Sequence, residues 1–184
     1  AVGYQSALAL TSGASNVLLG KGAGSALTTG SYNIAVGQSA LGNEDGHGRN
    51  VAIGYAALNV LNAGADGHNV AIGMEAGVAM TTGTGNTLIG GEAGDALTSG
   101  GHNVAIGYEA LGAEDTGGKN VAIGRRALKV QDLGATDGFN TVIGYEAGDA
   151  ISTGDENTII GANAGGLITS GQRNTIIGEG ADVA

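Results

Sequence analysis

The sequence predicts an all-β fold, a parallel β-roll in which one short repeat unit after another stacks along a single axis. The first reason is that an Asn followed by Gly at the fourth position after it recurs ten times at nearly constant spacing. The second is that the residues between this Asn and Gly are short, apolar and often β-branched, which favours a strand. The third is that the chain has 38 Gly and no Pro, so it can form tight turns without interrupting a backbone ladder.

Each repeat unit begins at the Asn and reads Asn-Val/Thr-x-Ile-Gly, usually with Ala at the third position after the Gly. An Asn at the same place in every unit can hydrogen-bond to its copies and to turn backbone, so we expect these side chains to form a structural ladder. The expected ladder consists of Asn16, Asn33, Asn50, Asn69, Asn86, Asn103, Asn120, Asn140, Asn157 and Asn174.

A unit of this length is too short for the helical hairpins of longer solenoid repeats. We therefore expect two short strands and two turns per rung, the first strand at Asn-Val-Ala-Ile-Gly and the second in the Ala-Leu-Thr-Ser region. About eleven rungs of 17–20 residues would make a rod on the order of 50 Å long at the usual strand spacing. Because the repeat covers nearly the whole chain, residues 1–184 are expected to form one repeat domain, a segment of a longer fibre.

A longer period of four repeat units is superimposed on the short one. The segment 40–45 (Ala-Leu-Gly-Asn-Glu-Asp) recurs in similar form at 110–115, and the expanded unit at 59–68 recurs at 129–139 with the same offset. Duplication explains this period most simply, and a functional spacing of equivalent loops is the alternative. Insertions in repeat proteins map to loops on one face, often the binding face, although a structural bulge is the simpler interpretation. The candidate binding residues in these loops are Asp66, His68, Asp137 and Phe139.

Successive strand residues point to opposite faces of a sheet. We expect the third residue after each Asn to line the roll interior and the second to point outward. That second residue is nevertheless always apolar, and a strand that is apolar on both faces is covered on both faces. We therefore predict that the roll packs against copies of itself. The predicted trimer-facing residues are Ala52, Ala71, Leu88, Ala105, Ala122, Val142, Ile159 and Ile176.

Composition excludes several classes of function. The absence of Cys excludes disulfides, thiol catalysis and Cys-ligated metal sites. A net charge of −10 makes nucleic acid and anionic membranes poor partners, and the short apolar runs cannot span a membrane. No triad spacing is present, and the phosphate-loop-like segment 112–119 places its Lys one residue too late. We expect no enzyme activity, no cofactor and no metal.

Four carboxylates share one position of the repeat, where like charges would repel along a stack. They are Glu75, Glu92, Glu109 and Glu146, and Arg126 occupies the same position between the last two. A bridging cation is one explanation, but a solvated outer face relieved by Arg126 is the simpler one. The three histidines, His47, His68 and His102, do not form a metal-binding pattern.

The repeat resembles the head of trimeric autotransporter adhesins, the YadA-like head, and similar repeats of bacteriophage tail fibres. Residues 144–147 (Gly-Tyr-Glu-Ala) and 27–30 (Leu-Thr-Thr-Gly) match the fibre form closely. The resemblance implies a left-handed β-roll and a homotrimer around one axis, on a bacterial cell surface or a virion surface. It also implies adhesion to a host cell-surface receptor, a glycan or a matrix protein, without catalysis. Rungs longer than the adhesin-head repeat favour the fibre-type relatives.

Two other classes of function remain open. One is a self-assembling extracellular filament subunit without a ligand, in which unpaired end rungs template stacking. The other is ice binding, which uses flat Thr arrays on solenoids. The Thr pairs here, such as Thr28-Thr29 and Thr81-Thr82, are interrupted by Glu-Asp and expanded units, which disfavours that function.

Overall fold

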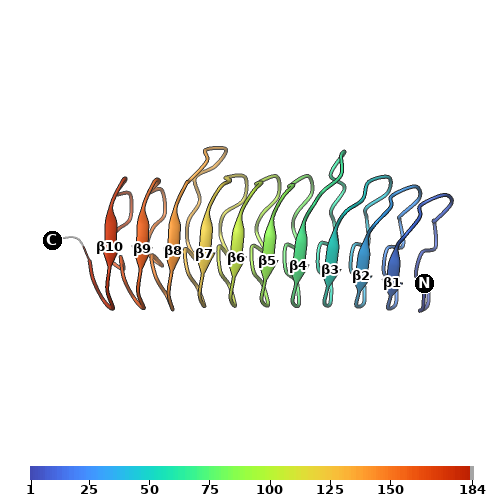
Figure 1. Cartoon of the computed structure of the whole chain (residues 1–184), viewed down its shortest axis with the longest axis horizontal. Helices are drawn as coiled ribbons and strands as arrows, with labels where there is room; N and C mark the ends of the chain where they lie inside the picture. The colour runs from blue at the N-terminus through green and yellow to red at the C-terminus, as the bar shows by residue number, and fades with distance from the viewer. Residues whose placement is uncertain (183–184) are drawn as a thin grey trace.

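The computed structural model, which describes residues 1–182, shows a parallel β-solenoid with its first and last described residues at opposite ends of a rod (Figure 1). The described residues contain no helix and ten strands of three residues each. The strands are β1 (Val17–Leu19), β2 (Ile34–Val36), β3 (Val51–Ile53), β4 (Val70–Ile72), β5 (Thr87–Ile89), β6 (Val104–Ile106), β7 (Val121–Ile123), β8 (Thr141–Ile143), β9 (Thr158–Ile160) and β10 (Thr175–Ile177). The predicted all-β parallel roll is confirmed.

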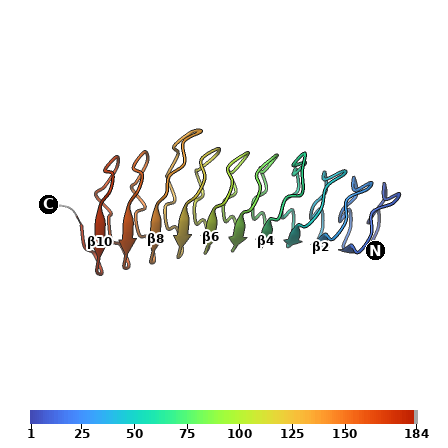
Figure 2. The ribbon, with the colours of Figure 1, turned by 45° about the horizontal axis from the view of Figure 1, so that its top comes forward.

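All ten strands form one sheet in chain order, and each pairs in parallel with the equivalent residues of the next rung. An isolated parallel bridge from Val2 to Leu19 marks the start of a further, partial rung. The structure thus has about nine turns, slightly fewer than the eleven rungs expected. Figure 2 shows how each strand runs into a tight turn, from which a return segment leads back to a loop and the next strand. We call the loop that precedes each strand the top turn, because it lies at the top of Figure 1.

The second strand expected in each rung is not formed in the described part of the chain. The return segment is a series of turns in which alternate residues have left-handed backbone, for example Glu75 (φ 57°) and Gly77 (φ 60°). Alternating left- and right-handed residues cannot make an extended ladder. The return segments still bond from rung to rung, because Gly77 N donates to the Ala93 carbonyl (3.0 Å) and Ala79 N to the Asp95 carbonyl (3.2 Å).

The core lies on the opposite side of the strands from the one predicted. The middle residue of every strand points into the roll and is buried within a single chain, so it is not a contact surface for other copies. The residues assigned to the trimer contact are all in this buried column: Ala52, Ala71, Leu88, Ala105, Ala122, Val142, Ile159 and Ile176. Conversely, the first and third strand residues, expected inside, point outward.

The reversal has a physical cause in how little space the roll encloses. Two further columns of side chains fill it. One is the Ala at the third position after the Gly that follows each strand, such as Ala93, and the other is a column of mostly Leu, Met or Ile, such as Leu97. The middle strand residue shares this space with both columns, and it is Ala in five of the ten strands. Where both strand faces are apolar, alternation alone does not say which one is inside.

In most rungs, volume is balanced between the strand's middle residue and the return segment. The β4 rung is the exception, because Ala71 is followed by Gly77 and leucines of the neighbouring rungs fill the space. The β5 rung pairs the larger Leu88 with Gly94, whereas the β6 rung pairs the smaller Ala105 with Leu111. A β-carbon built on Gly94 would lie 2.9 Å from Leu88 Cδ2, so the leucine occupies the space above this glycine. A large residue at one of these two positions is thus matched by a small one at the other in these rungs.

Candidate functional site

The outer face of the ten-stranded sheet is a continuous, largely apolar surface, with Thr at the first position of four strands. It consists of two columns of mostly β-branched side chains, from the first and third residue of every strand. Exposure ranges from half-buried in the central strands to 53% at Val17 and 67% at Ile177. At standard strand spacings the face is about 43 Å long and about 10 Å wide. No described segment of the chain packs over it.

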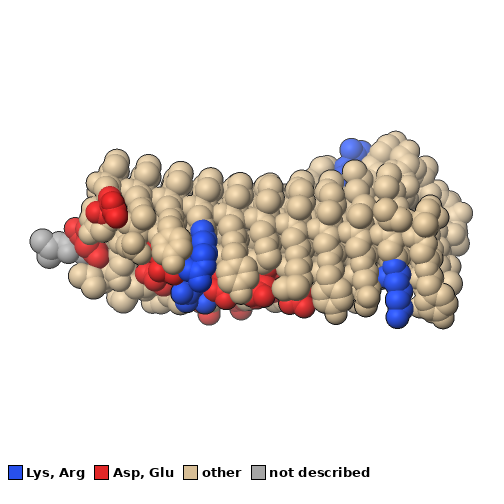
Figure 3. All heavy atoms as spheres, turned by 90° about the horizontal axis from the view of Figure 1, so that it is seen from below, with Lys and Arg blue, Asp and Glu red and all other residues tan. Residues whose placement is uncertain are grey.

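A charged and aromatic border follows the turn at the carboxyl ends of the strands. Tyr55, Tyr108 and Tyr145 are exposed there, together with Met74. Seen from below, acidic side chains gather along this edge, with basic ones beside them (Figure 3). The border therefore separates the apolar face from the return side of the roll.

The acidic column at this border is partly neutralised by neighbouring cations. Arg126 lies between Glu109 (3.3 Å) and Glu146 (3.2 Å), so it relieves the repulsion expected from the sequence. Lys129 also pairs with Glu109 at 2.6 Å, and that hydrogen bond lowers the pKa of the Glu109 carboxyl. Glu92 accepts a hydrogen bond from the Tyr108 hydroxyl (3.2 Å), which raises the pKa of the tyrosine. Three of the four carboxylates of this column are thus paired with side chains of the protein itself, namely Glu92, Glu109 and Glu146.

The asparagines form a continuous ladder at the other ends of the strands. From Asn33 onward, the backbone N–H of each donates to the Oδ1 of the Asn before it, as in Asn103 to Asn86 (2.9 Å) and Asn120 to Asn103 (3.0 Å). In most rungs the Nδ2 donates to a glycine carbonyl in the top turn, as Asn86 does to Gly100 (2.9 Å), and Asn33 donates to the His47 carbonyl (3.1 Å). The members from Asn33 to Asn157 are buried, which gives them a structural role.

Hydroxyl groups form a second ladder, which sequence reasoning missed. Thr28 Oγ1 donates to the Asp45 carbonyl (2.7 Å), Thr81 Oγ1 to the Thr98 carbonyl (3.2 Å), and Thr98 Oγ1 to the Asp115 carbonyl (3.0 Å). Each bond joins the top turn of one rung to that of the next. These hydroxyls hold rungs together and are not a free, regular array.

The expanded loops rise above the other top turns, between β3 and β4 and between β7 and β8 (Figure 1). In the first, Asp66 accepts a hydrogen bond from Arg49 Nε (2.7 Å), which lowers the pKa of the Asp66 carboxyl. The exposed His68 has its Nδ1 3.2 Å from the Asp66 carbonyl. Both candidate residues of this loop therefore lie together at its base.

The second expanded loop repeats this arrangement with different residues. Asp137 accepts a hydrogen bond from Lys119 Nζ (2.6 Å), and the same ammonium lies 5.0 Å from the centre of the Phe139 ring, which is 55% exposed. The two loops are four rungs apart, about 19 Å at the usual spacing. The candidate residues thus form two separate, equivalent surface groups and do not converge into one site.

Two buried glutamates were missed by the sequence reasoning. Glu44 and Glu114 stand in the core column otherwise occupied by residues such as Leu27 and Leu97, and both side chains are fully buried. Glu114 Oε1 accepts the Gly117 N–H (2.8 Å) and Oε2 the Leu133 N–H (3.4 Å). Burial raises the pKa of the Glu114 carboxyl to about 7. The longer repeat period was the available signal, because Glu replaces Leu at the same place in both copies of the four-unit cassette.

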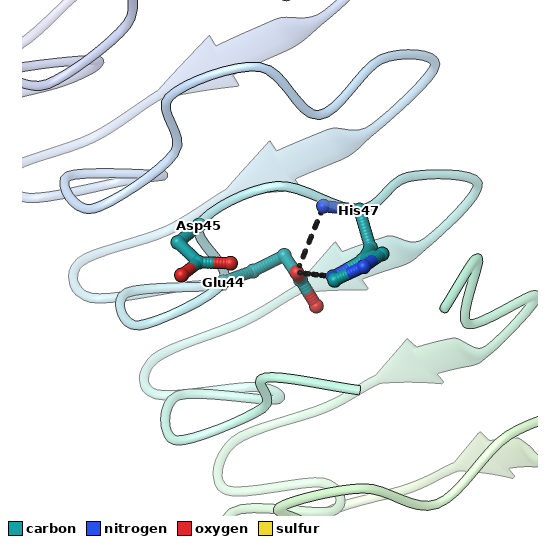
Figure 4. A group of neighbouring side chains, drawn as sticks. All are labelled: Glu44, Asp45 and His47. Atoms are coloured by element: carbon teal, nitrogen blue, oxygen red, sulfur yellow. Dashed lines mark hydrogen bonds and ion pairs between the residues drawn. The ribbon is translucent and has the colours of Figure 1, made fainter. Parts of the chain in front are cut away.

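The surroundings of Glu44 are similar. Its Oε1 accepts the His47 N–H (3.1 Å) and lies 3.3 Å from His47 Nδ1, and its Oε2 accepts the Ala63 N–H (3.4 Å). Figure 4 shows the glutamate side chain reaching toward His47. Potential ligand atoms of Glu44, Asp45 and His47 lie within 4.8 Å of one another, as do those of Glu114, Asp115 and Asp132. Since backbone N–H groups already occupy both glutamate oxygens, hydrogen bonding accounts for these clusters.

The described part of the chain has no pocket, and none of its segments is a helix long and apolar enough to cross a membrane. No protein-family model matches the chain, and no curated protein or solved structure is found to match it. Function is therefore inferred from the repeat sequence and from the surfaces of the roll.

Proposed function

We propose that this chain is a structural and adhesive segment of an extracellular trimeric fibre, of the adhesin-head or phage tail-fibre kind. In this proposal it lies on a bacterial cell or virion surface and binds a host cell-surface receptor, glycan or matrix protein through its expanded loops. The observation that carries the proposal is the outer sheet face, an apolar surface that runs the length of the rod.

Self-association through this face follows from its composition. A sheet that is apolar on both sides is normally covered on both sides, and large exposed apolar patches mark interaction sites. The face is flat and repeats in every rung, so three parallel left-handed rolls around one axis would each bury it against two neighbours. The trimer contact then consists of outward residues such as Ile106 and Ile123 in place of the buried middle column.

The expanded loops suit the adhesive role because they project from the roll beyond the other top turns (Figure 1). They carry exposed groups that a partner can reach, including the ring of Phe139 and the imidazole of His68. Burial of the sheet face in a trimer would leave these loops at the surface. Three chains would then present several copies of each loop, which strengthens weak adhesion by multivalency.

A loop-trimmed variant tests the adhesive role. Deleting residues 64–65 and 134–136 gives both expanded rungs the spacing of the ordinary ones without touching the strands. Wild-type and trimmed chains, immobilised on beads at equal density, are compared for binding to host cells and matrix-coated surfaces. We expect the trimmed chain to keep its oligomeric mass and lose binding. Equal binding by both chains would contradict the loop assignment, and no binding by either would leave a spacer or filament role.

A further inference from the structure

Each buried glutamate lies one rung before an expanded loop. Glu44 is in the rung of β2 and precedes the loop that follows β3, whereas Glu114 is in the rung of β6 and precedes the loop that follows β7. Leucine, methionine or isoleucine fills the same core position in seven other rungs, and the fully buried Gln131 occupies it in the rung of β7. A carboxylate in that column is costly unless its oxygens are hydrogen-bonded. The position must therefore provide something that a leucine does not.

The missing element is a hydrogen-bond acceptor for the expanded loop. In ordinary rungs the second N–H of the top turn donates to a carbonyl of the next rung, as Thr29 does to Asp45 (3.2 Å) and Ser99 to Asp115 (3.3 Å). In the expanded rungs the equivalent N–H groups belong to Ala63 and Leu133. They donate instead to the carboxylates of Glu44 and Glu114 in the preceding rung, each at 3.4 Å.

The second oxygen of each carboxylate holds the turn of its own rung. Glu114 Oε1 accepts the Gly117 N–H, and Glu44 Oε1 accepts the His47 N–H. Each glutamate therefore ties its own top turn to the first residues of the loop above. This explains why a Glu-Asp rung precedes an expanded rung in both copies of the four-unit cassette, a pattern for which sequence alone suggested only duplication.

We propose that Glu44 and Glu114 are positioning residues for the two expanded loops, and that the charge state of the Glu114 carboxyl sets how firmly the 131–138 loop is held. The proposal uses the proposed function only in taking these loops as binding elements. The coupling itself is a property of the chain alone.

Protonation changes the number of hydrogen-bond acceptor oxygens on the Glu114 side chain. An ionised carboxylate offers two acceptor oxygens, whereas the neutral acid has a carbonyl oxygen and a hydroxyl donor. The longer contact from Leu133 N (3.4 Å) is the one that protonation weakens, and the shorter one from Gly117 N (2.8 Å) remains. The charged groups that face this carboxyl are both acidic, Asp132 and Asp115. Burial, with a smaller contribution from these two acids, raises its pKa to about 7, so the change falls in the neutral range.

The corresponding charged neighbours of Glu44 differ. Asp45 and His47 face it, and Asn62 takes the place that Asp132 has in the second cassette. His47 Nδ1, at 3.3 Å, adds a positive partner when the imidazole is protonated. The two loops are therefore expected to respond differently to pH, and the 61–67 loop serves as an internal reference.

Hydrogen exchange of backbone amides tests the proposal in the wild-type chain and in Glu114→Gln and Glu114→Leu. Leucine is native to this column, so the fold is expected to survive, and unchanged exchange in β6 and β7 verifies it. After correction for intrinsic exchange, we expect Leu133 protection in the wild type to fall about tenfold between pH 8.5 and pH 5.5. Glu114→Gln should remove this pH dependence, and Glu114→Leu should leave the amide unprotected throughout.

Two outcomes would overturn the proposal. One is that Leu133 is as protected in Glu114→Leu as in the wild type, and the other is that the wild type and Glu114→Gln have the same pH profile. Glu44→Leu provides the matched control, because it should affect the 61–67 loop and leave 131–138 unchanged. Since exchange is measured without any partner, its result is independent of whether the loops bind a host surface.

Discussion

Replacing Leu88 by Ala tests how the roll is packed. Leu88 is fully buried, and its δ carbons occupy the space over two glycines: Cδ2 lies 2.9 Å from a β-carbon built on Gly94, and Cδ1 2.8 Å from one on Gly77. Removing the side chain therefore opens a void that extends over two rungs. Buried Leu→Ala substitutions cost about 2–5 kcal/mol, and a rigid ladder that cannot collapse places this one near about 4 kcal/mol.

The same packing predicts a specific rescue. The β6 rung already combines Ala105 with Leu111, and Leu111 has a positive φ (53°), as Gly94 has (57°). Gly94→Leu alone should cost about 1–3 kcal/mol, because it overfills the core against Leu88. In the Leu88→Ala background the same leucine enters the void, so the double variant should lie within about 1.5 kcal/mol of the wild type.

Urea unfolding of the four chains measures this cycle. Independent substitutions would add within about 0.5 kcal/mol, whereas the packing predicts a favourable coupling of several kcal/mol between these two positions. Additive losses in the double variant would refute the volume balance between strand and return segment.

Three further predictions concern the ladder, the turns and the buried acid. Asn103→Ala removes two hydrogen bonds from a buried site and should cost about 2–4 kcal/mol in thermal or urea unfolding, clearly more than Asn16→Ala at the half-buried end of the ladder. Gly107→Ala would overlap a carbonyl oxygen of the next rung and should prevent folding or cost several kcal/mol, whereas Gly134→Ala meets no atom and should cost about 1 kcal/mol. Folding raises the pKa of Glu114 from 4.5 to about 7, so the folded chain binds the extra proton. The free energy of unfolding therefore includes a contribution from this proton that is complete below pH 4.5 and is lost as the pH rises through about 7. The contribution is on the order of 3 kcal/mol, and Glu114→Gln should abolish the difference between the two pH values in urea unfolding.

The repeat made the strands and the ladder predictable. An Asn such as Asn103 recurs at a fixed place in every rung, and a short, mostly β-branched strand follows it, so stacking places equivalent residues on one another. The faces were not predictable, because Ala105 and Ile106 are both apolar and alternation does not say which is inside. Residue size does not say so either: Ala105 is inside and the larger Ile106 outside in β6, whereas Leu88 is inside and Ile89 outside in β5.

Other features depended on backbone geometry and burial that composition hides. The return segment looked like a strand, but residues such as Leu111 adopt left-handed backbone, which no propensity argument assigns to leucine. Glu114 stood in a Glu-Asp pair that resembles a solvated turn. The repeat register places it in line with Leu97, but its burial and its bond to the loop appear only when rung is stacked on rung.

The molecular mass of the chain in solution tests the central claim most directly, that the outer sheet face binds further copies. Sedimentation equilibrium of the wild type should give three times the 17.7 kDa of one chain. Ile123→Lys places a charge on the sheet face and should give the mass of a single chain. Val130→Lys, in the same rung but on the return side, should remain trimeric. A wild-type mass of 17.7 kDa, or equal masses for the two variants, would contradict the account.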